Sequence, residues 1–307
     1  MRIAPCLFAT IAFLFPGNLY AAKWSGISKD QIAALHDDDL DRHQAEVGYL
    51  DGLAVSEIRF SENGFQWHLL RFTSAEKPQG PLWIVPHDDE NAAFEAMIAA
   101  LRQYGGTGIA VNTGPASTRR QPGVGNCGVR AGTTTACDPN RNFDLKSPLF
   151  TANILDQHSA GQPIIALHTN SHGFSGDGEG GRGDISMLDA RAYRQGIIRP
   201  RADGHFGNRS VPSLDDPDIY AILPYPATKG ISETDNWCRT ALNAAGANVW
   251  HERVGTSDGS LSNYVALNLP EVGYLNAEAK RDDALSVAAE AQRLIVDSYL
   301  SKCVRQP

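Results

Sequence analysis

Three histidines of this 307-residue chain are followed, three positions later, by an acidic residue, and chance predicts about one such pair from nine histidines and 35 acidic residues. An imidazole and a carboxylate at this spacing can bind one metal ion from a single turn of backbone. One pair directly follows an apolar run, residues 82–86, and precedes an amphipathic helical pattern. This position is expected at the ligand-binding edge of an α/β sheet. We therefore take this pair as the candidate metal site. The three pairs are His36 with Asp39, His43 with Glu46, and His87 with Glu90, the last being the favoured one.

A third ligand is expected at the end of another strand. His168 follows the apolar run 164–167 and repeats the pattern that precedes His87, and His172, four residues later, is the competitor. Two histidines and one glutamate with an open fourth position are typical of hydrolytic zinc sites. The residue types therefore predict one zinc ion per chain.

The elements that must position these residues follow from hydrophobic periodicity. Apolar runs alternate with amphipathic helical segments, which predicts the α/β class: three α/β/α layers around a central mixed, largely parallel sheet. The predicted strands are 82–86, 108–112, 163–167, 247–251 and 273–276, and the predicted helices cover 94–101 and 284–299.

The N-terminal part divides into two segments. Arg2, the apolar run 3–15 and the break at Pro16 predict a signal peptide over 1–22, so we expect export across the inner membrane, to the periplasm in a Gram-negative cell. The apolar run is too short to span a bilayer, and we expect no transmembrane span in the mature chain. Residues 23–80 are predicted as an acidic, solvated helical segment followed by a hairpin, a small β element of strands 55–60 and 65–72 around Asn63-Gly64. The catalytic domain is then expected over 81–307.

Charge and cysteine content limit the partners and the compartment. A net charge of −8 gives no basic surface for nucleic acid, so none is expected as a partner. The four cysteines outside the leader fit an oxidising compartment. The short spacing of Cys127 and Cys137 favours a local disulfide, which leaves Cys238 to pair with Cys303, although three connectivities are formally open.

One segment carries a family resemblance. Residues 138–144, Asp-Pro-Asn-Arg-Asn-Phe-Asp, resemble the Asp-x-Asn-Arg-Asn-aromatic-Asp segment of the zinc carboxypeptidases of the funnelin, or carboxypeptidase A-like, class. The order of the pieces is similar too: His-x-x-Glu after a strand, the Asn-Arg segment, a strand-borne His, and a strand-borne Glu before the last helix. The resemblance covers about residues 81–300.

The resemblance implies a role for each matching residue. His87, Glu90 and His168 would bind zinc, and Asp138 would orient His87, since a ligating imidazole needs its other N–H held. Asn140 and Arg141 would bind a carboxylate of the substrate. The alternative for Arg141 is a structural ion pair with Asp144 or Asp138.

The remaining implied roles concern catalysis. Glu278 matches the general base that precedes the last helix, with Glu271 as its rival. Arg120 would stabilise the oxyanion, with Arg119 and Arg130 as alternatives. Tyr264 is the candidate for a tyrosine that assists from a mobile loop.

Together these residues predict an exported zinc metallopeptidase that hydrolyses an amide bond next to a substrate carboxylate. In an exported bacterial enzyme, the stem peptides of peptidoglycan are the expected peptide substrate. Two alternatives remain at this point: an N-acyl amino acid deacylase similar to succinylglutamate desuccinylase and aspartoacylase, and a catalytically silent peptide- or glycan-binding domain.

Overall fold

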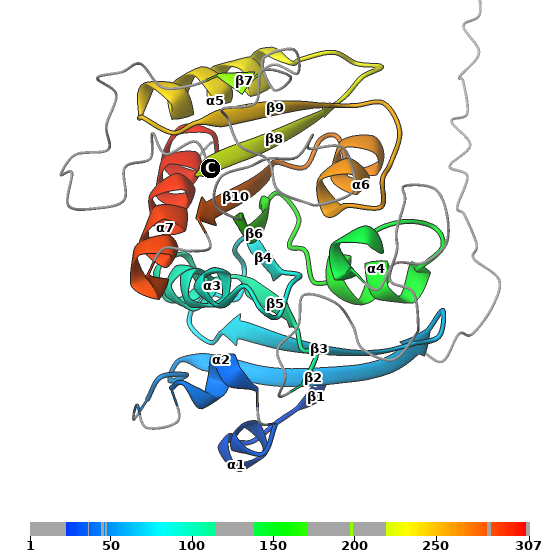
Figure 1. The fold of residues 1–307 in the computed structure, drawn as a ribbon, viewed down its shortest axis with the longest axis vertical. Coiled ribbons are helices and arrows are strands. Elements are labelled where there is room, and N and C mark those ends of the chain that lie inside the picture. Colours follow the sequence, from blue (N-terminus) through cyan, green and yellow to red (C-terminus); the bar gives the residue numbers. More distant parts are fainter. Residues whose placement is uncertain are drawn as a thin grey trace, which may run out of the picture.

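A computed structural model describes residues 23–35, 37–43, 46, 48–114, 138–170, 197–198, 219–280 and 284–304. The predicted signal peptide lies outside these residues. Within them the chain forms one ten-stranded sheet, in the order β1-β2-β3-β5-β4-β6-β10-β8-β9-β7 (Figure 1). The strands are β1 Ser25–Gly26, β2 Leu53–Glu62, β3 Phe65–Ser74, β4 Leu82–Val85, β5 Thr107–Val111, β6 Ile164–Asn170, β7 Ile197–Ile198, β8 Tyr220–Pro226, β9 Val249–Val254 and β10 Tyr274–Lys280.

The sheet is mixed, and its parallel part is central. Neighbours β5, β4, β6 and β10 run parallel, as do β8 and β9, whereas the other pairings are antiparallel. The carboxyl ends of the central parallel strands therefore meet at one edge of the sheet, where open α/β folds bind ligands.

Helices cover both faces of the sheet. Helices α3, α5 and α7 share one hydrophobic core with it, and α4 and α6 share the other. This gives the α/β class and the three layers that the sequence predicts. The helices are α1 Lys29–Ala33, α2 Asp38–Asp41, α3 Asn91–Tyr104, α4 Pro148–Leu155, α5 Glu233–Ala244, α6 Leu261–Asn268 and α7 Leu285–Lys302, with a 3-10 turn over Pro139–Arg141. Among the described helices, none is both long enough and apolar enough to cross a bilayer.

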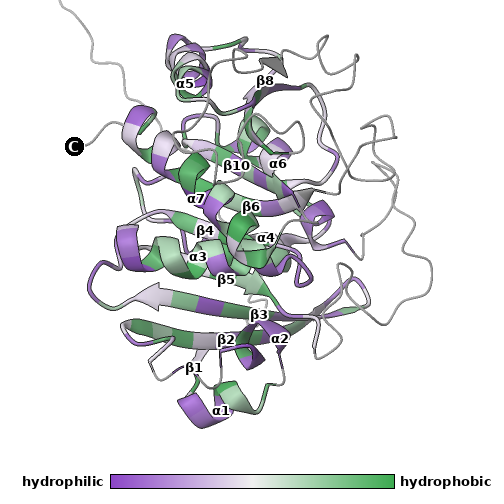
Figure 2. Ribbon diagram, turned by 60° about the vertical axis from the view of Figure 1, so that its left-hand side comes forward, coloured by the Kyte–Doolittle hydropathy of each residue, from purple (hydrophilic) through white to green (hydrophobic). Residues whose placement is uncertain are grey.

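The predicted hairpin is present and belongs to the main sheet. Strands β2 and β3 pair over their whole length around Asn63 and Gly64, whose positive φ values of 56° and 86° suit a tight hairpin turn. Both strands carry hydrophilic as well as hydrophobic residues (Figure 2). Since β3 also pairs with β5, the hairpin extends the sheet that carries the candidate site.

The expectation of a solvated helical segment near the N-terminus holds for α1, which has no buried residue, and is wrong for α2. Helix α2 is short, and Asp37 and Asp39 at its start are buried. Hydrogen bonds compensate this burial: Asp37 accepts from Leu40 N and from Asn112 Nδ2, and Arg42 pairs with Asp39. The segment is therefore fastened to Asn112, directly after β5.

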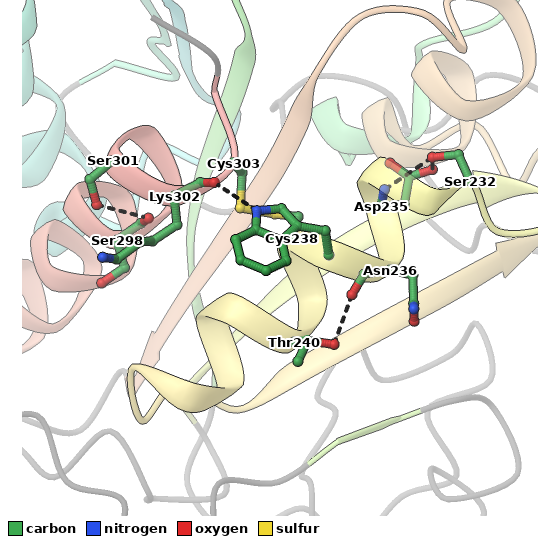
Figure 3. Close-up of a disulfide and its surroundings, with 10 residues drawn as sticks. Ser232, Asp235, Asn236, Cys238, Thr240, Ser298, Ser301, Lys302 and Cys303 are labelled. Atoms are coloured by element: carbon green, nitrogen blue, oxygen red, sulfur yellow. Dashed lines mark hydrogen bonds between the residues drawn. A yellow bond between two sulfur atoms is a disulfide. The ribbon is translucent and has the colours of Figure 1, made fainter.

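A disulfide joins Cys238 of α5 to Cys303 at the end of α7 (Figure 3). This is the pairing expected for these two cysteines, whereas Cys127 and Cys137 lie outside the described residues. The bond closes a stretch of 65 residues and ties together two helices on the same face of the sheet.

We expect the double substitution Cys238→Ala with Cys303→Ala to lower the free energy of unfolding by about 4 kcal/mol. The disulfide closes a long loop and so reduces the conformational entropy of the unfolded chain, and this stabilisation is lost in the double variant. Urea unfolding of the oxidised protein and of the double variant measures this difference. Equal midpoints would contradict it.

His251 of β9 predicts a loss of stability in acid. Its ring packs against Tyr225 and is buried, and neither ring nitrogen has a hydrogen-bond partner in the described part of the chain. Burial, with the nearby Arg239 guanidinium, lowers the pKa of His251 to about 4. The unfolded chain therefore binds the proton at higher pH than the native chain does, and stability falls as the pH drops from about 6.5 towards 4.

Between about pH 7 and pH 5 the wild type should lose about 2 kcal/mol more than His251→Phe, which keeps an aromatic ring but cannot titrate. Urea unfolding at both pH values tests this, and parallel losses in the two proteins would exclude His251 as the cause.

Candidate metal and catalytic site

Three buried side chains converge at the carboxyl ends of the central strands: His87, Glu90 and His168. His87 follows β4, and a turn in which Glu90 N donates to His87 O brings Glu90, at the start of α3, onto the same side. His168 lies within β6, beside β4 in the sheet. One nitrogen or oxygen atom of each residue lies within 4.8 Å of the others. The sequence-predicted ligand set is thus assembled from two adjacent parallel strands.

The contact distances at this cluster suit a metal ion. His87 Nδ1 lies 3.2 Å from His168 Nδ1 and 2.9 Å from Glu90 Oε1, and His168 Nδ1 lies 3.2 Å from Glu90 Oε2. Two nitrogens bound to one tetrahedral zinc ion are about 3.3 Å apart. The spacing of the two imidazoles therefore matches that of ligands to one ion.

The protonation of His87 supports the same interpretation. Its Nε2 lies 2.9 Å from Asp138 Oδ1, and since a carboxylate only accepts, Nε2 carries the proton. In the neutral ring this leaves a lone pair on Nδ1, which faces Glu90 and His168. A cation among these electron-rich atoms stabilises the arrangement, so the donor set fits a divalent metal.

Substituting Asp138 tests this orienting contact. Asp138→Asn keeps the size of the side chain and its cap on Asn140 N but weakens the charge-assisted contact to His87, so metal affinity should fall about tenfold to hundredfold. Competition with a chromogenic chelator measures the affinity. Asp144→Asn is the matched control, because Asp144 accepts from Lys146 N within the same segment; equal affinities in the two variants would contradict the role of Asp138.

The loop that carries His87 is hydrogen-bonded to the segment that follows β5. Buried Asp88 accepts from the backbone N–H and the hydroxyl of Thr113, which follows β5. Burial raises the pKa of Asp88 to about 7. These bonds hold the segments after β4 and β5 together beside His87.

The pairing of β6 with β10 places Glu278 beside His168 of the candidate metal cluster. Strands β6 and β10 are parallel, with Glu278 in register with His168. Register neighbours project to the same face, and adjacent strands are about 5 Å apart. Asn276 Nδ2 donates to Glu278 Oε1 over 3.0 Å. Its rival Glu271 is placed elsewhere, with a side chain that is 89% exposed and pairs with Lys229.

The Asn140-Arg141 segment contacts the loop before α6. Asn140 Oδ1 accepts from Leu261 N, and Arg141 Nη1 lies 3.5 Å from Asp258 Oδ2. Among the described residues the ion-pair partner of Arg141 is thus Asp258, not Asp144 or Asp138. Gly259, with φ 88°, passes so close that a Cβ atom would lie 2.5 Å from Arg141 O. Only glycine allows this approach.

Other predicted residues are placed differently or not described. Tyr264 lies on helix α6, so the expected loop position is wrong. It is partly buried and packs against the hydrophobic core shared with α4. The oxyanion candidates Arg119, Arg120 and Arg130, and the alternative ligand His172, lie outside the described residues.

Sequence reasoning missed two acidic residues that contact Asn263 in the first turn of α6, Asp258 and Glu252. Glu252 lies on β9, where its side chain shares a face with Trp250 and Val254. A carboxylate at a position where the strand pattern calls for an apolar residue was the available signal. The predicted strand 247–251 ended just before it.

The fold and the site together define an α/β protein with a candidate metal centre of two histidines and a glutamate. No protein-family model matches the chain, and a comparison with curated proteins gives no match. Solved structures do show likeness. A candidate metallopeptidase from Shewanella denitrificans OS217 has 14% identity and a TM-score of 0.44, with 94% of this chain and 99% of that chain covered.

Two further structures extend this comparison. A metallo-carboxypeptidase from Burkholderia cenocepacia shares 15% identity at a TM-score of 0.42, with 90% of this chain and 69% of that chain covered. A succinylglutamate desuccinylase from Silicibacter sp. TM1040 shares 11% at 0.40, with coverages of 84% and 69%.

Proposed function

We propose that this protein is an exported, zinc-dependent metallohydrolase of the carboxypeptidase type, which hydrolyses an amide bond next to a carboxylate of its substrate. The observation that carries the proposal is the convergence of His87, Glu90 and His168, with Glu278 in register beside His168. Two imidazoles and one carboxylate favour zinc over harder cations. A bound zinc ion would supply Lewis-acid chemistry, lowering the pKa of water and polarising the scissile carbonyl.

The protein's own groups would then move the protons and hold the substrate. Glu278 takes the proton of the attacking water and later delivers it to the leaving amine. Arg141 offers a planar guanidinium, which binds a carboxylate through two parallel hydrogen bonds. Its contact with Asp258 is long, so an incoming carboxylate can compete for it. Arg120 is proposed from the sequence alone as the group that stabilises the oxyanion.

The substrate class follows from the compartment. The leader-like residues 1–22 support export, and the disulfide between Cys238 and Cys303 is consistent with an oxidising environment. In the bacterial periplasm the abundant amide-linked polymer with free carboxylates is the stem peptide of peptidoglycan. We propose it as the substrate.

The test combines metal analysis with product identification. The chain from residue 23 is purified, its zinc is quantified, and it is incubated with defined muropeptides and, separately, with N-succinylglutamate and N-acetylaspartate. One zinc per chain and a cleaved muropeptide, identified by mass, support the proposal. Cleavage of the N-acyl amino acids alone would assign the protein to the deacylases, and stoichiometric zinc without any product would make it a binding module.

A further inference from the structure

The tip of the β2–β3 hairpin contacts the first turn of helix α4. Glu62, the last residue of β2, is buried, and its two carboxylate oxygens accept from Leu149 N over 2.8 Å and from Phe150 N over 2.9 Å. Pro148, at the first position of the helix, has no N–H, so these are the first two backbone donors of α4, which lack an acceptor inside the helix. Glu62 therefore caps α4 from a distant part of the chain.

Asn63, the next residue of the hairpin, contacts the residues just before α4. Its Nδ2 donates to Lys146 O over 2.6 Å and to Ser147 Oγ over 3.3 Å. The hydroxyl of Ser147, the N-cap of α4, in turn donates to Oδ1 of the buried Asn142 over 3.1 Å. From α4 itself, Thr151 Oγ1 donates to Asn142 O over 3.1 Å. The hairpin tip and the helix that it caps therefore hold Asn142 by its side chain and by its backbone.

Asn142 closes the turn that presents Arg141. Asp138 O accepts from Arg141 N over 3.0 Å and from Asn142 Nδ2 over 2.8 Å, so the Asn142 amide bridges the two ends of this turn. A further bond, from Phe143 N to Gly259 O over 2.9 Å, ties the same segment to the loop before α6. The backbone position of Arg141 thus depends on Asn142, and through Asn142 on the hairpin.

We propose that Glu62 and Asn63 are positioning residues: they fix the turn over residues 138–142 so that the guanidinium of Arg141 meets the carboxylate of the substrate. The inference rests on the proposed function, because it explains how the carboxylate-binding residue of that site is held. A displacement of about 1 Å, caused by a substitution far from the reacting atoms, can cost about a hundredfold in rate. The hairpin, which supplies no reacting group in the proposed chemistry, thereby contributes to substrate recognition.

The experiment measures the preference for a carboxylate. The ligands are a defined stem peptide with free carboxylates and the same peptide with every carboxylate amidated. Calorimetry on zinc-loaded protein that carries Glu278→Gln gives both affinities with hydrolysis suppressed. We expect the free peptide to bind at least about tenfold more tightly, since amidation removes the paired hydrogen bonds of a guanidinium with a carboxylate.

Two further substitutions should lower this preference while the zinc content stays the same. Glu62→Gln keeps the shape of the side chain but turns an NH₂ group towards a backbone N–H of α4, and the preference should fall about fivefold. Asn63→Gly removes the exposed amide and keeps the turn, because its φ of 56° suits glycine, and the preference should fall about threefold.

Glu57→Gln and Ser61→Ala are the matched controls. Both residues lie on β2, and their side chains bond to other residues of the hairpin. They should keep the preference within about twofold. A substitution that only loosens the fold would weaken the binding of both peptides equally, so the ratio of the two affinities distinguishes positioning from a general loss of stability.

The outcomes separate this inference from the proposed reaction. A preference that falls in Glu62→Gln and Asn63→Gly, in a protein whose wild type cleaves no stem peptide, would refute the peptidase and retain the inference. Cleavage by the wild type, with the preference unchanged in both variants, would overturn the inference and retain the peptidase. Equal affinities for the two peptides before either substitution would refute both, because Arg141 would then hold no carboxylate. If Glu62→Gln does not fold, the result for Asn63→Gly decides.

Discussion

Glu278→Gln should lower kcat about a thousandfold while the protein keeps its zinc and its fold. Glutamine has the same shape as glutamate but cannot take up the proton of the attacking water, and general acid–base catalysis contributes about 10²- to 10⁴-fold. Glu278 is fixed by the sheet beside His168, and Asn276 holds one of its carboxylate oxygens, so the substitution leaves the surroundings in place. The rate is measured on the cleaved muropeptide, and zinc is quantified in the same preparation.

Glu271→Gln provides the matched control for this experiment. Glu271 was the rival base, and its side chain points to solvent beside Lys229. Its substitution should leave kcat within about twofold, as expected for an exposed group away from the reaction. If Glu271→Gln abolished activity and Glu278→Gln did not, the assignment of the base would be reversed.

His168→Ala should abolish zinc binding and activity together. Removing one of the three proposed ligands leaves only His87 and Glu90. Substituting a group that merely hydrogen-bonds a metal ligand lowers metal affinity about tenfold to hundredfold, so we expect the zinc affinity of His168→Ala to fall by more than about a hundredfold. After dialysis against a chelator, the variant should retain less than about a tenth of the wild-type zinc. Elemental analysis measures the retained metal.

His158→Ala is the control for the loss of an imidazole. His158 contacts Gln162 O after helix α4 and lies apart from the cluster. It should therefore bind zinc as the wild type does. A His168→Ala protein that binds stoichiometric zinc with unchanged affinity would refute the ligand set, whatever its activity.

The parts of the fold that could be predicted are those encoded by local pattern. The Asn63-Gly64 turn, the short apolar strand before His87 and the amphipathic helix after Glu90 each depend on neighbouring residues only. The candidate ligands could be found for the same reason, since His87 and Glu90 lie in one turn and His168 follows an apolar run. Their meeting in space then follows from parallel neighbouring strands.

The parts that escaped prediction depend on contacts between distant segments. Strand β8 was not predicted, and its antiparallel pairing with β10 inside an otherwise parallel region has no local signature. The pairing of Arg141 with Asp258 has no local signature either, because it depends on the approach of two loops. Tyr264 shows a different kind of error. It was expected on a loop because of the role implied for it, although it lies within a helix.

The register of β6 and β10 has a consequence for how this scaffold can diversify. Gln292 of α7, fully buried, donates to the backbone carbonyls of His168 and Ala277 and so clamps the two strands from the opposite face. The proposed metal ligand and the proposed base are thus spaced by main-chain geometry. The contact between Arg141 and Asp258, in contrast, depends on the approach of two loops. Directed evolution could therefore exchange the recognition half for a new substrate while the reactive half keeps its dimensions.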